Sequence, residues 1–203
     1  MTNLTQKLAL GAASLAVGLV LGWAVRGTAT YNTATQAMTS YESWRVACPA
    51  ANQKDVNCEM IQDVLDSQSH SEITRIAIVH PVGGKLTLNL TMPLGVALEP
   101  GVGLTFQADT DSKDPKDQKA AKDAMITAKY RTCTQQGCVV DIPIDDKLQS
   151  QLDGDKDGRL VFVSANDTKP IAIPLSLKGY GAAKRAYNNS EAKRSSWFWR
   201  MWS

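Results

Sequence analysis

The chemical motif with the most specific spacing is a short acidic run in the C-terminal third of the chain. Asp153, Asp155 and Asp157 stand at alternate positions and Gly158 follows them, which matches the start of a calcium-binding loop. Such a loop ends at its twelfth position with a bidentate Glu, whereas that position here is Ser164 in a predicted strand. We therefore expect an acidic turn between a helix and a strand. A calcium site at the three aspartates is the alternative, and no cofactor is predicted.

Catalytic chemistry has little support in the sequence. The two histidines are His70, in a polar stretch, and His80, directly before Pro81 at a predicted strand end. Neither belongs to a nucleophile–base arrangement, and the sequence contains no GxSxG, HExxH or P-loop motif. Asp145 and Asp146 stand at a predicted helix start, where capping and the helix dipole explain them. We expect that the protein is not an enzyme.

Four cysteines form two close pairs along the chain. Cys48 and Cys58 are ten residues apart, and Cys133 and Cys138 are five apart. Neither spacing fits a zinc site or the CxxC of a thioredoxin-like redox motif. Four cysteines allow three pairings, and the sequence alone does not choose between them. We expect the two local disulfides, because Gly137 would let the backbone turn tightly enough to close the smaller loop.

The chain ends in a basic tail that is rich in tryptophan. Residues 192–203 (AKRSSWFWRMWS) hold three of the five tryptophans. Tryptophan beside Lys and Arg suits a membrane interface, and it equally suits an anchor in the groove of a partner protein. A tail that folds back on its own domain, or has no fixed structure, is the third alternative. The predicted membrane- or partner-binding residues are Trp197, Phe198, Trp199, Arg200 and Trp202.

The N-terminal segment predicts a membrane helix. Between Lys7 and Arg26, residues 8–25 carry no charge, and a helix of that length spans about 27 Å against a hydrocarbon core of about 30 Å. We expect an uncleaved signal anchor with its N-terminus in the cytoplasm, and a signal peptide cleaved near residue 29 is the alternative. Gly18 and Gly22 have the GxxxG spacing that lets membrane helices associate, although glycine is common in such helices.

Short apolar runs after residue 41 predict strands. In one of them Leu86, Leu88 and Leu90 alternate with polar residues, as in a strand with one buried face. Prolines fall at the ends or edges of the runs. Strands are expected over 73–79, 85–91, 139–144, 160–164 and 171–177, helices over 145–152 and 180–187, and a solvated loop over 109–123. The pattern favours a mainly β fold, a single antiparallel β-sandwich or barrel-like domain with one or two short helices.

Several stretches of the chain share a pattern of strands, a proline–glycine turn and cysteines. They are Trp44 with Cys48 and Cys58, LTLNLTMPLGVALEPGVGL at 86–104, YRTCTQQGC at 130–138 and IAIPLSLKGYGAA at 171–183. Over residues 41–186 the chain thereby resembles the invasion-associated locus B proteins of alphaproteobacteria. The resemblance implies an exported all-β domain, a periplasmic or envelope location and a part in host-cell invasion. It implies no catalytic residues, and only the cysteines carry over.

Composition and charge exclude two broad classes of protein. With 43% hydrophobic and 21% charged residues, the chain is not wholly disordered. Its 22 Lys and Arg oppose 20 Asp and Glu, and this net charge of +2 is not that of a strongly basic nucleic-acid-binding protein. Residues 178–203 hold six Lys or Arg and one Glu, a charge of +5, which leaves −3 for the remainder.

These observations predict four segments and a location. We expect a transmembrane anchor over 1–26, a polar tether over 27–40, a β-rich periplasmic domain over 41–186 and a basic Trp-rich tail over 187–203. The predicted protein is a single-pass protein of the bacterial inner membrane and a non-catalytic accessory or scaffold subunit of an envelope assembly. Its expected partners are the membrane and an envelope protein, and helix–helix association through the anchor is a further alternative. A secreted or surface-exposed factor that contributes to host-cell invasion is the alternative.

Overall fold

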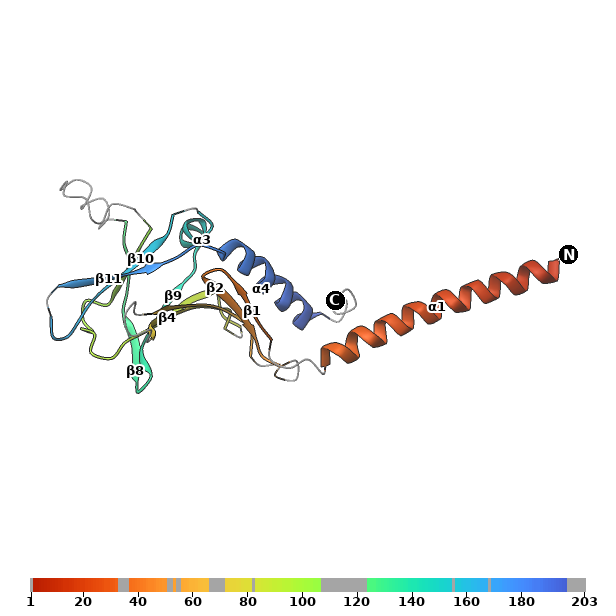
Figure 1. Cartoon of the computed structure of the whole chain (residues 1–203), viewed down its shortest axis with the longest axis horizontal. Helices are drawn as coiled ribbons and strands as arrows, with labels where there is room; N and C mark the ends of the chain where they lie inside the picture. Colours follow the sequence, from red (N-terminus) through yellow and green to blue (C-terminus); the bar gives the residue numbers. More distant parts are fainter. Residues whose placement is uncertain are drawn as a thin grey trace.

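The β-domain is a sandwich of two antiparallel sheets, and a long N-terminal helix projects away from it (Figure 1). The computed structural model describes residues 2–32, 37–50, 53, 56–65, 72–81, 83–106, 124–154, 156–167 and 169–196. Within these residues the order of elements is one helix, nine strands, a short helix, two strands and a final helix. The prediction of a mainly β, antiparallel fold is confirmed, and the two separate sheets make it a sandwich rather than a barrel.

The larger sheet has seven strands in the described residues. In spatial order they are β1 (Ala37–Tyr41), β2 (Trp44–Cys48), β3 (Glu59–Leu65), β4 (Glu72–Val79), β5 (Thr87–Met92), β9 (Gly137–Pro143) and β8 (Tyr130–Thr134). Every neighbouring pair is antiparallel. The sheet therefore has two edge strands, β1 and β8.

The smaller sheet has four strands in the described residues, and they close the other side of the core. Their spatial order is β11 (Pro170–Leu175), β10 (Gly158–Val163), β6 (Val102–Thr105) and β7 (Ile126–Ala128). Pro170 and Pro174 lie in β11, an edge strand. An edge strand tolerates proline because one row of its backbone groups makes no ladder hydrogen bonds.

Alternating side chains fill the space between the sheets. In β5, Leu88, Leu90 and Met92 are fully buried, while Asn89 lies on the opposite face and donates to Asp141 across the strand pair at 2.6 Å. This confirms the predicted strand with one buried face. Leu104 and Leu160 of the smaller sheet join the same core. Burial of this shared apolar surface is the main force that holds the two sheets together.

Two helices flank the sandwich. α3 (Asp146–Leu152) begins where its acidic start predicts, because the Asp145 carboxylate accepts a hydrogen bond from Leu148 N at 2.7 Å and caps the helix. α4 (Tyr180–Ser195) also begins as predicted but continues well past residue 187, and it packs over β1, β2 and β3. Gly179 precedes α4 with φ +79°, and a Cβ there would lie 2.1 Å from the Tyr41 carbonyl oxygen.

The N-terminal segment differs from its predicted boundaries. α1 (Thr2–Asn32) extends six residues beyond Arg26, and β1 begins at Ala37, so the segment predicted as a tether over 27–40 has regular structure at both ends. The polar sequence of β1 becomes a strand because Tyr41 and Trp44 close a tight hairpin onto β2. Taken over the described residues alone, no helix combines the length and the apolarity needed to cross a bilayer.

Candidate functional site

The described β-domain begins and ends at the same end of the sandwich. Ala37, the first residue of β1, pairs with Cys48, the last residue of β2. Cys48 is bonded to Cys58, and Arg194 in the last turn of α4 contacts the segment between them. Figure 1 shows α1 and the end of α4 on one side of the body. We call this end the terminal face, made of residues 37–38, 48–50, 53, 56–58 and 80–81 and the last turn of α4.

Long-range polar contacts hold the terminal face together. The Arg194 guanidinium donates to the carbonyl oxygens of Pro49 at 3.0 Å, Gln53 at 2.6 Å and Val56 at 2.8 Å. Cys58 N donates to Glu191 Oε1 at 2.6 Å, one helical turn earlier in α4. Because these contacts join α4 to the loop between β2 and β3, the end of the helix has a fixed position on the domain.

A cavity of about 450 Å³ lies in the terminal face. Its lining comes from the end of β2, the loop between β2 and β3, the start of β3 and the end of β4 with the residues after it: Ala47, Pro49, Gln53, Val56, Asn57, Cys58, Glu59, Val79, His80 and Pro81. The Asn57 side-chain amide donates to the His80 carbonyl oxygen, and Glu59 pairs with Arg75 at 3.0 Å. These polar groups stabilise the fold and do not converge on one point as the groups of a catalytic site do.

Three buried or half-buried tyrosines of the domain have raised pKa values. Burial, with a contribution from the Glu191 carboxylate, raises the pKa of Tyr187 to about 12. Burial alone raises the pKa of Tyr130 to about 12. Burial also raises the pKa of Tyr180, an effect that its hydrogen bond to Gln149 opposes. All three phenols are therefore protonated at neutral pH, and none is suited to act as a base there.

Both disulfides follow the local pairing predicted from the sequence. Cys48–Cys58 joins the end of β2 to the residue before β3, with Cα atoms 4.1 Å apart. Cys133–Cys138 joins directly opposed residues of the β8–β9 hairpin, with Cα atoms 3.9 Å apart. The first bridge belongs to the terminal face, whereas the second fastens an edge of the larger sheet.

The acidic run after α3 has structural partners. The Asp153 carboxylate accepts from Lys184 Nζ at 2.7 and 2.8 Å, which ties α3 to α4. Asp157 Oδ1 accepts from Leu177 N at 2.6 Å, which fixes the chain between β11 and α4. Asp155 lies outside the described residues. The two described aspartates thus bind different segments of the protein, and the calcium alternative stays a prediction.

Other predicted site residues fall outside the part of the chain that the structure describes, or lie in α1. Outside it are His70, Trp197, Phe198, Trp199, Arg200 and Trp202. Gly18 and Gly22 lie in α1, and no described atom outside the helix backbone lies within 4 Å of a Cβ built at either position. The helix association predicted for these glycines therefore needs a second chain and stays a prediction.

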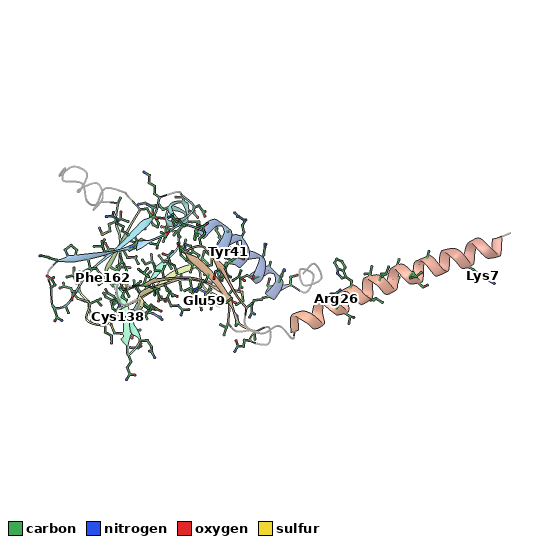
Figure 2. The ribbon with its side chains drawn as sticks, viewed as in Figure 1. Lys7, Arg26, Tyr41, Glu59, Cys138 and Phe162 are labelled. Carbon is green, nitrogen blue, oxygen red and sulfur yellow. A yellow bond between two sulfur atoms is a disulfide. The ribbon has the colours of Figure 1, made fainter. Side chains whose placement is uncertain are left out.

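The opposite end of the sandwich exposes several large apolar side chains. Leu94, Leu98 and Ile171 have exposed fractions of 59%, 54% and 41%. Ala97 N donates to Val163 O at 2.8 Å and Ala165 N donates to Gly95 O at 2.7 Å, so the loop before β6 lies along the end of β10. Ile171 is opposite Phe162 of β10, which Figure 2 places on the side of the body away from α1. We call Leu94, Leu98 and Ile171 the distal rim.

A polar bridge between the sheets was not predicted from the sequence. Gln62 of β3 exchanges two hydrogen bonds with the backbone of Ser176, at 2.8 and 2.9 Å, and the Trp44 indole N–H donates to Ser176 O at 2.8 Å. The Trp44 ring also meets Tyr180 edge to face, with ring centroids 5.4 Å apart. Contacts with the larger sheet therefore hold the start of α4 in place, as contacts with the loop between β2 and β3 hold its end.

A second cavity, of about 460 Å³, lies beside the β1–β2 turn. Two of the charged residues that line it pair with each other. Arg45 and Asp63 form an ion pair there across β2 and β3. Asp63 Oδ1 is buried and has no hydrogen-bond partner among the described atoms. A single carboxylate that is already paired with Arg45 does not by itself make a binding site.

Comparison with known proteins finds one family that is similar to this chain in both sequence and fold. The family model of the invasion associated locus B (IalB) proteins matches residues 44–188. Two invasion protein B homologs of Brucella abortus, from strain 2308 and from biovar 1 strain 9-941, are each 27% identical over 151 residues, or 74% of this chain and 78% of each relative. The crystal structure of invasion associated protein B from Bartonella henselae matches with a TM-score of 0.59 and 22% identity, and the match covers 79% of this chain and 99% of that one.

The matched region contains the whole of the described sandwich from β2 to the middle of α4, including both disulfides. The structural match shows the shared fold, and the family match covers well over half of the chain. The chain belongs to the invasion associated locus B family.

Proposed function

We propose that this protein is a non-catalytic binding module of the bacterial envelope. Its N-terminal helix anchors it in the inner membrane with a single pass. Its disulfide-bonded sandwich lies in the periplasm, where it acts as an accessory or scaffold subunit of an envelope assembly. The membrane and an envelope protein are its partners.

The observation that carries the proposal is the distribution of apolar side chains on α1. Leu19, Val20 and Leu21 follow one another and have exposed fractions of 71%, 63% and 59%. Successive helix residues are about 100° apart, so these three side chains surround most of the helix. A helix that docks in a protein groove is apolar along one stripe, whereas a helix that is apolar all round needs apolar surroundings. A bilayer provides such surroundings.

The disulfides support an oxidising compartment for the sandwich. Cys48–Cys58 and Cys133–Cys138 use all four cysteines of the chain. Disulfides persist in the periplasm and outside the cell but are rare in the cytoplasm of mesophiles. A sandwich that follows an N-terminal membrane helix, and that lies on the periplasmic side, explains both features.

The distal rim supports a role in binding. Leu94 and Leu98 lie in a loop that backbone hydrogen bonds hold against β10, so their exposure is a fixed property of the surface. Exposed apolar side chains grouped at one end of a domain are typical of protein-interaction sites. We propose that the distal rim contacts the envelope partner.

Membrane fractionation with analysis of the native N-terminus tests the proposal. We expect the chain to retain residues 1–26, to resist alkaline extraction and to dissolve only in detergent. Release into the medium of a chain that begins near residue 30 would contradict the anchor and support the secreted, host-contacting alternative.

Affinity purification after mild solubilisation tests the accessory role. We expect a defined envelope protein to co-purify with the wild-type chain. Recovery of a lone monomer under conditions that preserve other envelope complexes would contradict a scaffold function.

A further inference from the structure

We propose that the second cavity binds an extended segment of a partner protein, which adds a strand to the open side of β3 and places a lysine or arginine side chain at Asp63. We call this cavity the β3 groove. It is formed by residues 40, 42–43, 45, 62–65, 174 and 176, which belong to the β1–β2 turn, the end of β3 and the end of β11. The inference goes beyond the proposed function, because it needs neither the membrane anchor nor the distal rim.

The first argument is that β3 extends beyond the strand that pairs with it. β2 pairs with β3 no further than Arg45, which lies opposite Ile61, whereas β4 pairs with β3 as far as Leu65. Residues 62–65 therefore have a neighbouring strand on one side and none on the other, within the part of the chain that the structure describes. Successive strand residues direct their backbone N–H and C=O groups to alternate sides, so two of these four residues offer hydrogen-bonding groups to the open side.

The second argument is that the walls of the β3 groove are held in place by the protein itself. Ser43 N donates to Lys178 O at 3.4 Å, which attaches the β1–β2 turn to the segment before α4. Another wall is fixed because Gln62 exchanges two hydrogen bonds with the Ser176 backbone. A preformed groove binds more tightly than one that must first be ordered, because less conformational entropy is lost on binding.

The third argument is a carboxylate oxygen in the β3 groove that lacks a hydrogen-bond donor. Asp63 Oδ2 pairs with Arg45, whereas Asp63 Oδ1 is buried and accepts no hydrogen bond from any described atom. Glu42 adds a second carboxylate, so the groove holds two negative charges and one positive charge. A lysine or arginine side chain supplies both the missing donor and the missing positive charge, and a charged donor makes a stronger hydrogen bond than a neutral one.

The side chains of β3 define the sequence pattern that the β3 groove fits. Asp63 and Leu65 lie on the same face of the strand because side chains alternate, and Leu65 has an exposed fraction of 55%. The residues of an added strand share a face with the β3 residues that they lie opposite. The partner segment therefore has a basic residue opposite Asp63 and an apolar residue two positions away, opposite Leu65.

β11, the other strand that borders the β3 groove, is unsuited to pairing with the same segment. Pro174 lines the groove, and Pro170 lies four residues earlier in this edge strand. Strand residues four apart direct their backbone groups to the same side, and neither proline has an N–H group to donate there. The partner segment therefore pairs with β3, and β11 serves as a wall.

Hydrogen exchange of the full chain in detergent tests the proposal with a designed probe. The probe is a capped eight-residue peptide in which threonine alternates with valine and a lysine replaces one central valine. At about 1 mM probe, we expect the open-side amides among residues 62–65 to exchange about tenfold more slowly. A probe with N-methyl groups along its pairing edge should give no protection, because it cannot donate to β3. Unchanged exchange at 62–65, or equal protection by the N-methylated probe, would overturn the proposal.

Variants assign the binding to Asp63 and Leu65. Asp63→Asn should weaken binding of a fluorescent probe about tenfold, and a probe with glutamate in place of lysine should bind about tenfold more weakly to the wild-type chain. Asp63→Asn also changes the ion pair with Arg45, so Leu65→Ser provides a second test at an exposed position and should weaken binding about fivefold.

Leu94→Ser at the distal rim is the matched control for Leu65→Ser, because the two side chains have exposed fractions of 59% and 55%. It should leave binding of the probe unchanged. Equal binding of the lysine and glutamate probes, or equal effects of the two leucine substitutions, would overturn the proposal.

A second copy of the chain in the β3 groove would show separately. Exchange at residues 62–65 would then slow without any probe as the protein concentration rises, and this result would also overturn binding of a partner segment. None of these measurements uses membrane fractionation or recovery of the envelope partner. Their failure would therefore leave the proposed function standing, and failure of the proposed function would leave these results unchanged.

Discussion

The two ends of the sandwich expose similar apolar side chains but are built in different ways. At the terminal face, a disulfide closes the loop between β2 and β3, and the side chains of Glu191 and Arg194 join this loop to α4, which is far away in sequence. At the distal rim, backbone hydrogen bonds between adjacent segments hold Leu94 and Leu98 in place. The first end depends on a disulfide and on side-chain hydrogen bonds, whereas the second depends on backbone hydrogen bonds between residues 95–97 and 163–165, which are also far apart in sequence.

The difference indicates different roles for the two ends. The terminal face follows α1 along the chain after a short connection, and the described chain leaves it again at Ser196. No described segment leads from the distal rim to α1, and Phe162, the strand partner of Ile171, lies on the side of the body away from α1 (Figure 2). We interpret the terminal face as the attachment end and the distal rim as the end that is presented to a partner.

The largest expected effect is that of Trp44→Ala, because it removes the contact that fixes α4 on the larger sheet. Trp44 is fully buried, packs against Tyr180 and donates to Ser176 O. We expect the free energy of unfolding to fall by about 3–5 kcal/mol, measured by chemical denaturation. A loss below about 1 kcal/mol would show that α4 does not depend on this contact.

Removal of each disulfide should have the next largest effect. The chain-entropy model gives about 2–3 kcal/mol for loops of this size and a larger value for Cys48–Cys58, whose residues are 10 apart, than for Cys133–Cys138, which are 5 apart. The paired variants C48S/C58S and C133S/C138S are compared by thermal unfolding. Only the first pair should speed hydrogen exchange at the terminal face, and equal exchange in both would contradict the distinction between the two bridges.

Arg194→Gln should lower the free energy of unfolding by destabilising the terminal face, and it should leave the structure of the distal rim unchanged. Its guanidinium donates to three backbone carbonyl oxygens, and we expect a loss near the lower end of about 1.5–3 kcal/mol because the side chain is only partly buried. Arg185→Gln, at an exposed position of the same helix, is the control and should change stability by less than about 0.5 kcal/mol. Equal effects of the two substitutions would contradict a stabilising role for the hydrogen bonds that Arg194 donates to the loop between β2 and β3.

Stability should fall at alkaline pH because of the buried phenols. The pKa of Tyr187 is about 12 in the folded chain against an ordinary 10.0, so above pH 10 the unfolded chain loses this proton first. Unfolding therefore becomes easier as pH rises from 10 to 12 and is insensitive to this group below pH 10. Tyr187→Phe should flatten that slope, and so should Tyr130→Phe at the far edge of the larger sheet. An unchanged slope in both variants would contradict the assignment of this pH dependence to the Tyr187 and Tyr130 phenols.

The smallest effect on stability is expected at the distal rim. Leu94→Ser with Leu98→Ser removes exposed side chains, and the free energy of unfolding should change by less than about 0.5 kcal/mol per site. The same variant should lose the envelope partner in affinity purification, whereas Met38→Ser at the terminal face should keep it. Equal partner recovery in all three proteins would mean that the partner binds elsewhere.

Local patterns predicted a large part of the fold. The alternation at Leu88 and Leu90 fixed the buried face of β5, and the acidic start at Asp145 marked the cap of α3. The two disulfides followed from the short spacing of the cysteines. Each of these features depends on residues that are close in sequence, where period, capping and loop length leave a readable signal.

Features that depend on distant partners were not predicted. The residues of β1 (AMTSY) have the composition of a loop and become a strand only through pairing with β2. The acceptors of Arg194 are backbone carbonyl oxygens, which every residue type provides, so residue type at 49, 53 and 56 carried no signal. The terminal face could therefore be recognised only after the fold had brought these segments together.

One measurement compares the two ends directly in the intact chain. Met38→Cys and Leu98→Cys introduce labelling sites of nearly equal exposure at the terminal face and the distal rim. A fluorophore at each site is measured in reconstituted vesicles that contain lipids with nitroxide headgroups. We expect strong quenching at position 38 and little at position 98. Equal quenching at the two positions, or stronger quenching at 98, would contradict attachment through the terminal face.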